Sequence, residues 1–310
     1  MQIYFAPLEG ITGYVFRNAY AKYYGGVDKY FTPFITPHTK KLMNSREKRD
    51  ILPENNIGVR IVPQVLTNKT EELIDICERL KEYGYHEVNL NLGCPSRTVT
   101  AKGKGSGFLE EPQKLEEFFD RFFKVSDTRL SIKTRIGVSE VEEAARLFRI
   151  FERFPFEEVI IHARLQQEFY QGTPHYDVFE SYCKSSRHSL CYNGDIRSRQ
   201  DLEQWNQRWE KCDKFMLGRG LLFNPGALLM TEETAYSSME RFQGFHDEIL
   251  AGYDAYMCGD RNTLFKMKEL WGYWGASFAG QEKLLKQIKK VNTLAEYRPL
   301  VKTILQSAIE

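Results

Sequence analysis

The sequence predicts an α/β fold in which a (β/α)8 barrel is followed by a small domain built only of helices. Short apolar runs recur eight times, at about thirty residues per unit, and a stretch with helical periodicity follows each run. After residue 235 no strand-like run remains, and apolar residues recur at helical spacing. We therefore expect a barrel domain over residues 1–235 and a helical domain over residues 236–310.

The eight predicted strands are short and apolar. In chain order they are Ile3–Leu8, Val27–Phe34, Val59–Leu66, Glu87–Gly93, Leu130–Ile136, Val159–Arg164, Ser189–Gly194 and Lys214–Gly218. Among the intervening stretches, an amphipathic helix is predicted over Thr70–Tyr83, Pro112–Val125, Ser139–Phe154 and Ser198–Trp209. A doubly wound open sheet alternates in the same way, but no G-x-G-x-x-G follows the first strand, so a TIM barrel is favoured.

Composition narrows the class of protein. Hydrophobic residues make up 42% and charged residues 27% of the chain, which is typical of soluble globular proteins. The net charge is only +1, so any contact with nucleic acid has to come from local patches. Six cysteines are scattered without a C-x-x-C pair, which argues against a metal site or a disulfide framework. With no signal-like N-terminus and no membrane-spanning run, we expect a cytoplasmic protein that contacts no membrane.

The segment 88–108 combines a strand, a thiol and a basic, glycine-rich stretch. Alternating apolar residues predict a strand that breaks at Gly93-Cys94-Pro95. We expect the polar residues 97–104 to form an open, mobile loop that closes over a site. Residue type alone leaves Cys94 open between a buried structural thiol and a reactive group at the end of a strand.

Candidate site residues, most of them polar or glycine, stand at the end of nearly every predicted strand. They are Pro7, Leu8 and Glu9 at the end of the first strand, Gln64 at the third, Asn91 and Cys94 at the fourth, Lys133 and Arg135 at the fifth, His162 and Arg164 at the sixth, Asn193, Gly194 and Asp195 at the seventh, and Gly218 and Arg219 at the eighth. Barrel enzymes build their active sites at this rim, and they often hold a phosphate after strands seven and eight. These positions together predict a phosphorylated cofactor.

Each rim residue also has a structural explanation when it is taken alone. Lys133 and Arg135 fit solvated strand ends, and His162 fits a hydrogen-bonded core histidine. Asp195 fits the cap of the helix that begins near Ser198.

The C-terminal domain is predicted to contain three helices. Ser237 and Glu240 form a capping box, a second helix follows Asn262, and a third covers Gln281–Leu294. The third helix would carry Lys283, Lys286 and Lys290 on one face, which is most often a solvated surface. The aromatic group Trp271, Tyr273, Trp274 and Phe278 fits a core better than a base-stacking platform.

Asn91-x-Gly93-Cys94-Pro95, followed by Gly105-Ser106, closely resembles the motif of the tRNA-dihydrouridine synthases, flavin enzymes that reduce uridines in transfer RNA. The resemblance covers most of the barrel and, more faintly, the helical tail. It extends to Ala6–Gly10, Pro63-Gln64, Ile132–Arg135, His162–Arg164, Asn193–Asp195 and Gly218-Arg219. The chain departs from the family pattern at Leu8, usually methionine, at Gly13, usually aspartate, and at Leu165, usually threonine.

The resemblance implies a role for each matching residue. Pro7, Leu8, Glu9 and Gln64 would line FMN, Lys133 and His162 would bind the flavin or the surroundings of the pyrimidine, and Asn193, Gly194, Asp195, Gly218 and Arg219 would lie at the phosphate. Cys94 would donate a proton and Asn91 would hold the target base. We expect the tRNA to be contacted by Arg135, Arg164, Lys102, Lys104, Lys286 and Lys290, with further phosphate contacts from Lys40, Lys41 and Arg97.

The implied reaction reduces the C5–C6 bond of uracil in the D-loop of tRNA. A hydride from reduced FMN would reach C6, a proton from Cys94 would reach C5, and NADPH would reduce the flavin again. We expect a monomer without a metal. Two alternatives stay open: an FMN enzyme acting on a free pyrimidine, similar to dihydroorotate dehydrogenase, and a tRNA-binding protein that has lost catalysis.

Overall fold

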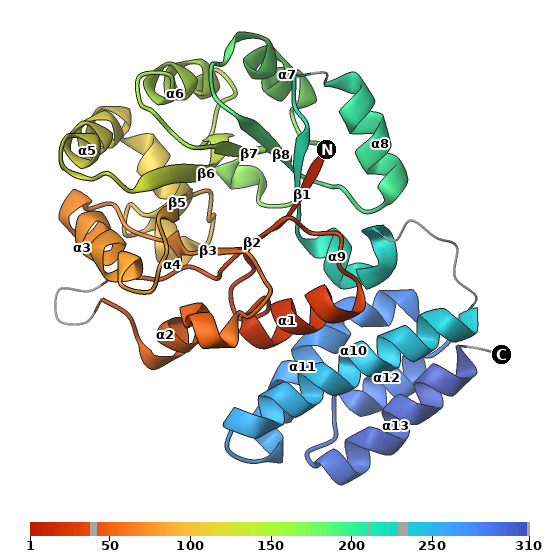
Figure 1. The fold of residues 1–310 in the computed structure, drawn as a ribbon. Helices are drawn as coiled ribbons and strands as arrows, with labels where there is room; N and C mark the ends of the chain where they lie inside the picture. The colour runs from red at the N-terminus through yellow and green to blue at the C-terminus, as the bar shows by residue number, and fades with distance from the viewer. Residues whose placement is uncertain (38–41, 210, 229–234, 309–310) are drawn as a thin grey trace.

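Parallel strands form a barrel that is surrounded by helices, and a bundle of helices packs against one side of it (Figure 1). The structure is a computed structural model and describes residues 1–37, 42–209, 211–228 and 235–308. Within these ranges the strands are β1 (Gln2–Phe5), β2 (Lys29–Phe31), β3 (Ile61–Val62), β4 (Gln64–Val65), β5 (Glu87–Leu92), β6 (Arg129–Gly137), β7 (Val159–Leu165), β8 (Leu190–Asn193) and β9 (Lys214–Leu217).

The sheet returns on itself through the third predicted strand. The strand order is β3-β2-β1-β9-β8-β7-β6-β5-β4, and all the pairings are parallel. Only Pro63 separates β3, which pairs with β2, from β4, which pairs with β5. Proline has no N–H for the ladder, so it divides one strand position into two short strands. The predicted barrel of eight strand positions is therefore confirmed.

Nine helices of the described residues accompany the barrel strands. They are α1 (Tyr14–Tyr23), α2 (Ser45–Ile51), α3 (Thr70–Lys81), α4 (Arg97–Thr100), α5 (Pro112–Val125), α6 (Glu143–Phe151), α7 (Tyr176–Ser185), α8 (Arg199–Arg208) and α9 (Arg219–Phe223). Three of the four whose bounds were predicted, α3, α5 and α8, begin within one residue of the predicted start. The helix predicted from Ser139 begins only at Glu143. The Glu143 carboxylate accepts the backbone N–H groups of residues 138–140 at 2.8–3.0 Å, which fixes a turn before the helix.

The two ends of the barrel differ in chemistry. Its interior is packed with Tyr4, Ala6, Phe31, Val62, Ile160, Cys191 and Met216. At the N-terminal ends of the strands, the buried Glu158 carboxylate accepts from Tyr4 Oη at 2.5 Å, Lys214 Nζ at 2.7 Å and Lys29 Nζ at 3.2 Å. Lys29 Nζ also pairs with Glu87 at 2.9 Å. This closed polar cluster leaves the opposite end of the barrel for a site.

The helical region contains α10 (Ala235–Tyr256), α11 (Asp260–Trp274), α12 (Glu282–Ile288) and α13 (Leu294–Ser307). The predicted first helix is present as α10, which includes Ser237. The single helix predicted over Gln281–Leu294 is wrong, because α12 ends at Ile288 and Thr293 caps α13 in a capping box with Glu296. Lys290 therefore lies beyond α12 and shares no helix face with Lys286.

Helix α10 packs closely against α1, and the two run side by side in Figure 1. A Cβ added at Gly252 would lie 2.6 Å from Val15 Cγ1, and one at Gly244 would lie 2.5 Å from the ring of Tyr23. The two glycines thus permit a contact that larger residues would block.

No helix in the described ranges is both long and apolar enough to cross a membrane.

The predicted aromatic core of the helical region is largely confirmed. Trp271, Trp274 and Phe278 are buried, and Trp271 Nε1 donates to Tyr297 Oη at 2.6 Å. Tyr273, which was assigned to the same core, instead lines a pocket at the barrel.

Candidate active site

The C-terminal ends of the strands open into a pocket of about 330 Å³. Most of the predicted site residues line it: Pro7, Leu8, Glu9, Gln64, Asn91, Cys94, Lys133, Arg135, His162, Asn193, Gly194, Asp195, Gly218 and Arg219. The barrel topology thus brings together residues that are widely separated in the sequence.

The segment after Cys94 is folded, which corrects the expectation of an open loop. It forms α4 and a 3-10 helix over Gly105–Glu110. The buried Ser106 donates to the carbonyl oxygen of Cys94 from its backbone N at 3.1 Å and from Oγ at 2.9 Å. Gly105 has φ +58°, and a Cβ there would lie 2.7 Å from the same oxygen. Backbone contacts, rather than polarity along the sequence, decide that this stretch is ordered.

A directional chain of amides holds Cys94 in place. Asn91 Oδ1 accepts the N–H groups of Gly93 at 3.0 Å and Cys94 at 2.9 Å, so its Nδ2 faces Gln64 Oε1 at 2.8 Å. Gln64 Nε2 then donates to Asn89 Oδ1 at 2.8 Å, and Asn89 Nδ2 donates to a serine hydroxyl on β6. Each side-chain amide in this buried chain donates to the oxygen of the next residue, so the donors and acceptors are paired throughout. Asn91, predicted to hold the target base, therefore positions the thiol as well.

We predict that Asn91→Ala destabilises the fold by about 1–3 kcal/mol, because two N–H groups and the Gln64 carbonyl lose their partner. Turnover should fall at least tenfold, since Cys94 loses the bond that places its backbone. Denaturant unfolding and steady-state rates check both effects. Asn89→Ala is the control, because it breaks the same chain without touching the two N–H groups. Equal turnover in the two variants would contradict the positioning role.

The Cys94 thiol is half-buried at the pocket. Burial raises the pKa of Cys94, while a backbone hydrogen bond from Ser96 and the charges of Arg135 and Lys133 act in the opposite direction. The thiol therefore keeps its proton at neutral pH. It is suited to donate a proton rather than to attack as a thiolate.

His162 is held neutral by its surroundings. Arg164 Nη1 donates to His162 Nε2 at 3.1 Å, which places the ring proton on Nδ1. Burial lowers the pKa of His162 well below its ordinary value, and the nearby positive charges of Arg135, Lys133 and Arg164 lower it further. The neutral ring, which lines the pocket, thus carries its N–H on Nδ1.

Arg164 holds the site together but does not line the pocket, which corrects its assignment to substrate. Its guanidinium is fully buried. It donates to the carbonyl oxygens of Gln171 at 3.0 Å and Gly172 at 2.5 Å, and to Asp195 Oδ2 at 2.5 Å. Asp195 is thereby engaged with Arg164, and Ser198, paired with Asp201, is the residue that caps α8.

Lys133 and Arg135 make this part of the pocket strongly basic. Burial, with a further effect of the Arg135 charge, lowers the pKa of Lys133 to about 8. Arg135 lines the pocket while donating to backbone oxygens of Gly93, Leu165 and Phe169 at 2.7–2.9 Å. A half-buried lysine of this kind favours an anionic or electron-rich ligand.

Lys133 should make stability depend on pH. Its folded pKa of about 8 lies below the ordinary value of 10.5, so between these values the unfolded chain holds a proton that the folded chain has released. The free energy of unfolding should therefore gain a rising contribution with pH in this window. In flavin-free protein, Lys133→Met should lose that contribution, as measured by denaturant unfolding at several pH values. The exposed Lys102→Met is the control, and a wild-type curve for Lys133→Met would contradict the assignment.

The loops after β8 and β9 form the glycine-rich end of the pocket. Asp195 has φ +45°, and a Cβ at Gly220 would lie 2.2 Å from the Ile196 carbonyl oxygen, so the two loops meet without room for a side chain. Arg197 and Arg219 line this end, and Arg219 is 3.6 Å from Asp195. Close backbone approach with two cations suits a phosphate.

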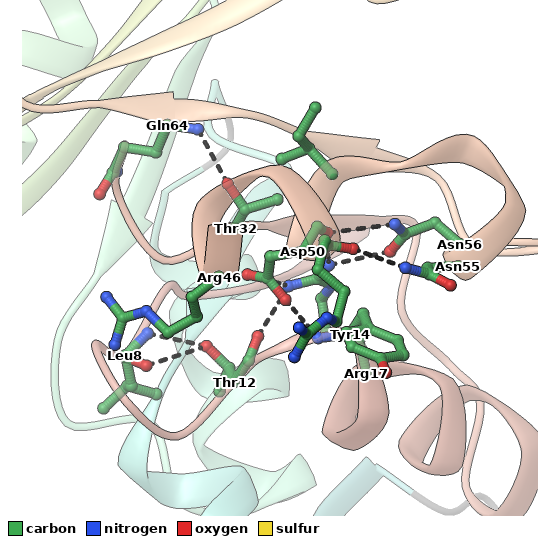
Figure 2. A network of polar contacts seen from close by, with 12 residues as sticks. Leu8, Thr12, Tyr14, Arg17, Thr32, Arg46, Asp50, Asn55, Asn56 and Gln64 are labelled. Carbon is green, nitrogen blue, oxygen red and sulfur yellow. Dashed lines mark hydrogen bonds and ion pairs between the residues drawn. The ribbon is translucent and has the colours of Figure 1, made fainter. Parts of the chain in front are cut away.

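A buried network supports the turn that follows β1 (Figure 2). Arg17 donates to the carbonyl oxygen of Thr12 at 2.8 Å and pairs with Asp50 at 3.3 Å. Thr12 Oγ1 in turn accepts the N–H of Leu8 at 2.8 Å. A Cβ at Gly13 would lie 3.2 Å from Asp50 Oδ1, which accepts the N–H of Tyr14 at 2.5 Å. Asp50 on α2 thus supplies a carboxylate beside the position where Gly13 departs from the family pattern.

Several pocket residues were missed by the sequence prediction, among them Arg197 and the aromatic residues Phe34, Tyr170 and Tyr273. The ring of Tyr170 stacks on His162 at 6.0 Å and lies 4.3 Å below the Arg219 guanidinium. Tyr273 comes from α11, so the helical region supplies part of the wall. Tyr170 follows a predicted strand and was readable as a rim residue, whereas the place of Tyr273 depends on tertiary packing.

The predicted tRNA-binding lysines lie away from the pocket. Lys102, Lys286 and Lys290 are exposed, and Lys104 is 3.7 Å from Glu72. Lys40 and Lys41 lie outside the described residues. Their role in RNA binding stays a prediction.

The model of the dihydrouridine synthase family matches residues 4–303. The chain belongs to this family. A probable tRNA-dihydrouridine synthase of Staphylococcus epidermidis is 26% identical over 313 residues, with 96% of this chain and 92% of the relative covered. tRNA-dihydrouridine synthase B of Pasteurella multocida is 24% identical over 225 residues, with 72% and 67% covered. This membership confirms the resemblance that is based on the Cys94 motif and disfavours the free-pyrimidine alternative.

Similarity to solved structures supports the barrel fold. Morphinone reductase superposes with a TM-score of 0.53 at 12% identity, covering 76% of this chain and 88% of that chain. The same enzyme in complex with tetrahydroNAD gives a TM-score of 0.51.

Within the described part of the chain, no group of three or more His, Cys, Asp or Glu side chains is placed to hold a metal ion.

Proposed function

We propose that the protein is an FMN-dependent tRNA-dihydrouridine synthase that reduces the C5–C6 bond of a D-loop uridine at the expense of NADPH. The observation that carries the proposal is the place of Cys94, whose backbone N–H is held by Asn91 at the wall of a basic pocket. Family membership supports the reaction class. We further propose that the enzyme acts as a cytoplasmic monomer.

The residues that line the pocket fit FMN. Arg197, Arg219 and the closely packed glycine loops would hold the phosphate. A Cβ at Gly218 would lie 3.4 Å from Ala6 Cβ and take up space between two walls of the pocket. Lys133 and the Nδ1–H of His162 would donate hydrogen bonds to the polar edge of the cofactor or of the pyrimidine.

The chain's own residues would orient the uridine and deliver the proton. Reduced FMN would supply the hydride for C6, a step that no amino-acid side chain performs. Cys94 would transfer its proton to C5, and the positive charges of Lys133 and Arg135 would stabilise the thiolate that forms. The folded segment after Cys94 would exclude water from the thiol.

The size and basicity of the pocket suit a base that has left its stack. Extruding a uridine costs a few kcal/mol and least in a loop, which favours the D-loop over a stem. Tyr170 and Phe34 offer rings against which such a base can pack. Part of the wall comes from α11, so the RNA would contact both the barrel and the helical region.

Purified protein tests the proposal directly. We expect a yellow protein whose released flavin is FMN, and NADPH-dependent formation of dihydrouridine in unmodified tRNA. Free uridine and uracil serve as substrates for comparison and should react far more slowly. A colourless protein that binds tRNA would favour the inactive alternative, and rapid turnover of a free pyrimidine would contradict the tRNA reaction.

A further inference from the structure

A second pocket, of about 270 Å³, lies where α2 of the barrel meets α10 and α11. Most of its wall surface is apolar, and Tyr14, Phe34, Tyr256 and Met257 lie on it half-buried. The rings of Tyr14 and Tyr256 are 6.0 Å apart at an angle of 33°. Half-buried aromatic faces of this kind suit a flat ligand.

The charges around this pocket favour an anion. Its two carboxylates are already engaged: Asp50 with Arg17, and Glu47 with the N–H groups of Thr36 at 3.1 Å and Asn44 at 2.7 Å. Lys266 donates to the carbonyl oxygen of Gly10, and Arg46 pairs with Glu9.

Arg49 is the cation left for a ligand. Its guanidinium centre lies 4.5 Å from the ring centre of Tyr256, and it forms no ion pair with the described residues. A cation resting on an aromatic face combines the two features that recognise a nucleotide, a site for the phosphate and a site for the base.

The second pocket adjoins the active site. Phe34 lines both pockets, and the ion pair between Glu9 of the first and Arg46 of the second joins their walls. A single-stranded RNA whose uridine enters the first pocket would therefore bring a neighbouring nucleotide to the second.

We propose that this pocket binds an unpaired nucleotide of the same RNA, next to the uridine that is reduced. The base packs against the Tyr14 and Tyr256 rings, and the phosphate pairs with Arg49. The inference rests on the proposed function, because it takes tRNA as the ligand. Aromatic rings stack with any base, so this pocket would not select the RNA sequence. It would increase the affinity for the RNA and fix its position relative to the active site.

Binding of an unmodified tRNA transcript to the flavin-loaded protein tests the inference by fluorescence anisotropy. Tyr256→Leu should raise Kd about tenfold, and Tyr256→Phe, which keeps the ring, should bind as the wild type does. Arg49→Gln should reduce the slope of log Kd against log salt by about 0.7, the value for one phosphate contact on a single strand. The exposed Lys48→Gln on the same helix is the matched control and should leave the slope unchanged. Flavin content and NADPH oxidation should match the wild type in every variant.

The outcomes separate this inference from the proposed function. If Tyr256→Leu binds tRNA with the wild-type Kd and Arg49→Gln keeps the wild-type salt slope, the second pocket does not bind the RNA. The proposed reaction would be unaffected by that result. A wild-type protein that neither binds tRNA nor forms dihydrouridine would overturn the proposed function and this inference with it.

Discussion

Replacing Cys94 with serine is expected to lower dihydrouridine formation by about 10²–10⁴-fold, the usual contribution of a general acid. The thiol keeps its proton in this environment, whereas a serine hydroxyl is far less acidic and cannot transfer its proton to C5 at a useful rate. The measurement is a single turnover of unmodified tRNA by enzyme that has been reduced with NADPH beforehand.

The loss should be confined to the tRNA half of the reaction. Flavin content and the rate of NADPH oxidation should stay at wild-type values, since Cys94 supplies the proton and not the hydride. The exposed Cys258→Ser is the matched control, because it removes a thiol away from the pocket. A full single-turnover rate in Cys94→Ser would contradict the assigned role.

Replacing Glu158 with glutamine is expected to destabilise the protein by about 3–5 kcal/mol, as for a buried ion pair that loses one partner. The Glu158 carboxylate accepts hydrogen bonds from Tyr4, Lys29 and Lys214. Glutamine is neutral and has one side-chain oxygen, so it can neither balance the two lysine charges nor accept all three bonds. Denaturant unfolding gives the change in free energy.

The neighbouring Glu157→Gln is the matched control. Glu157 is exposed and lies 3.4 Å from Arg129, so its replacement should cost at most about 1 kcal/mol. The Glu158 variant should keep its turnover wherever it is folded, because the cluster lies at the end of the barrel opposite the pocket. Equal stability of the two variants would contradict the role of the buried cluster.

The sequence was informative wherever chain topology alone decides position. Gln64 and Lys133 lie on different strands, yet both reach the pocket, because parallel strands of a barrel end at one rim. The same rule identified the glycine loops at Gly194 and Gly218. No knowledge of packing was needed for these residues.

The sequence was misleading where a side chain's partners decide its role. Arg164 stands at a strand end like Lys133, but its donors are used by backbone oxygens and Asp195, so it cannot face the ligand. Tyr273 reaches the pocket only because α11 folds back against the barrel. Thr293 and Glu296 form a capping box that indicates the start of α13. The helical periodicity of the apolar residues continues across this point, so one helix was predicted where there are two.

Dihydrouridine mapping at nucleotide resolution, in tRNA from cells that lack this protein, tests the central claim most directly. We predict that dihydrouridine is lost at a defined D-loop position and that wild-type protein, but not Cys94→Ser, restores it. An unchanged dihydrouridine profile, alongside a yellow protein that oxidises NADPH, would contradict the assignment of tRNA as the substrate.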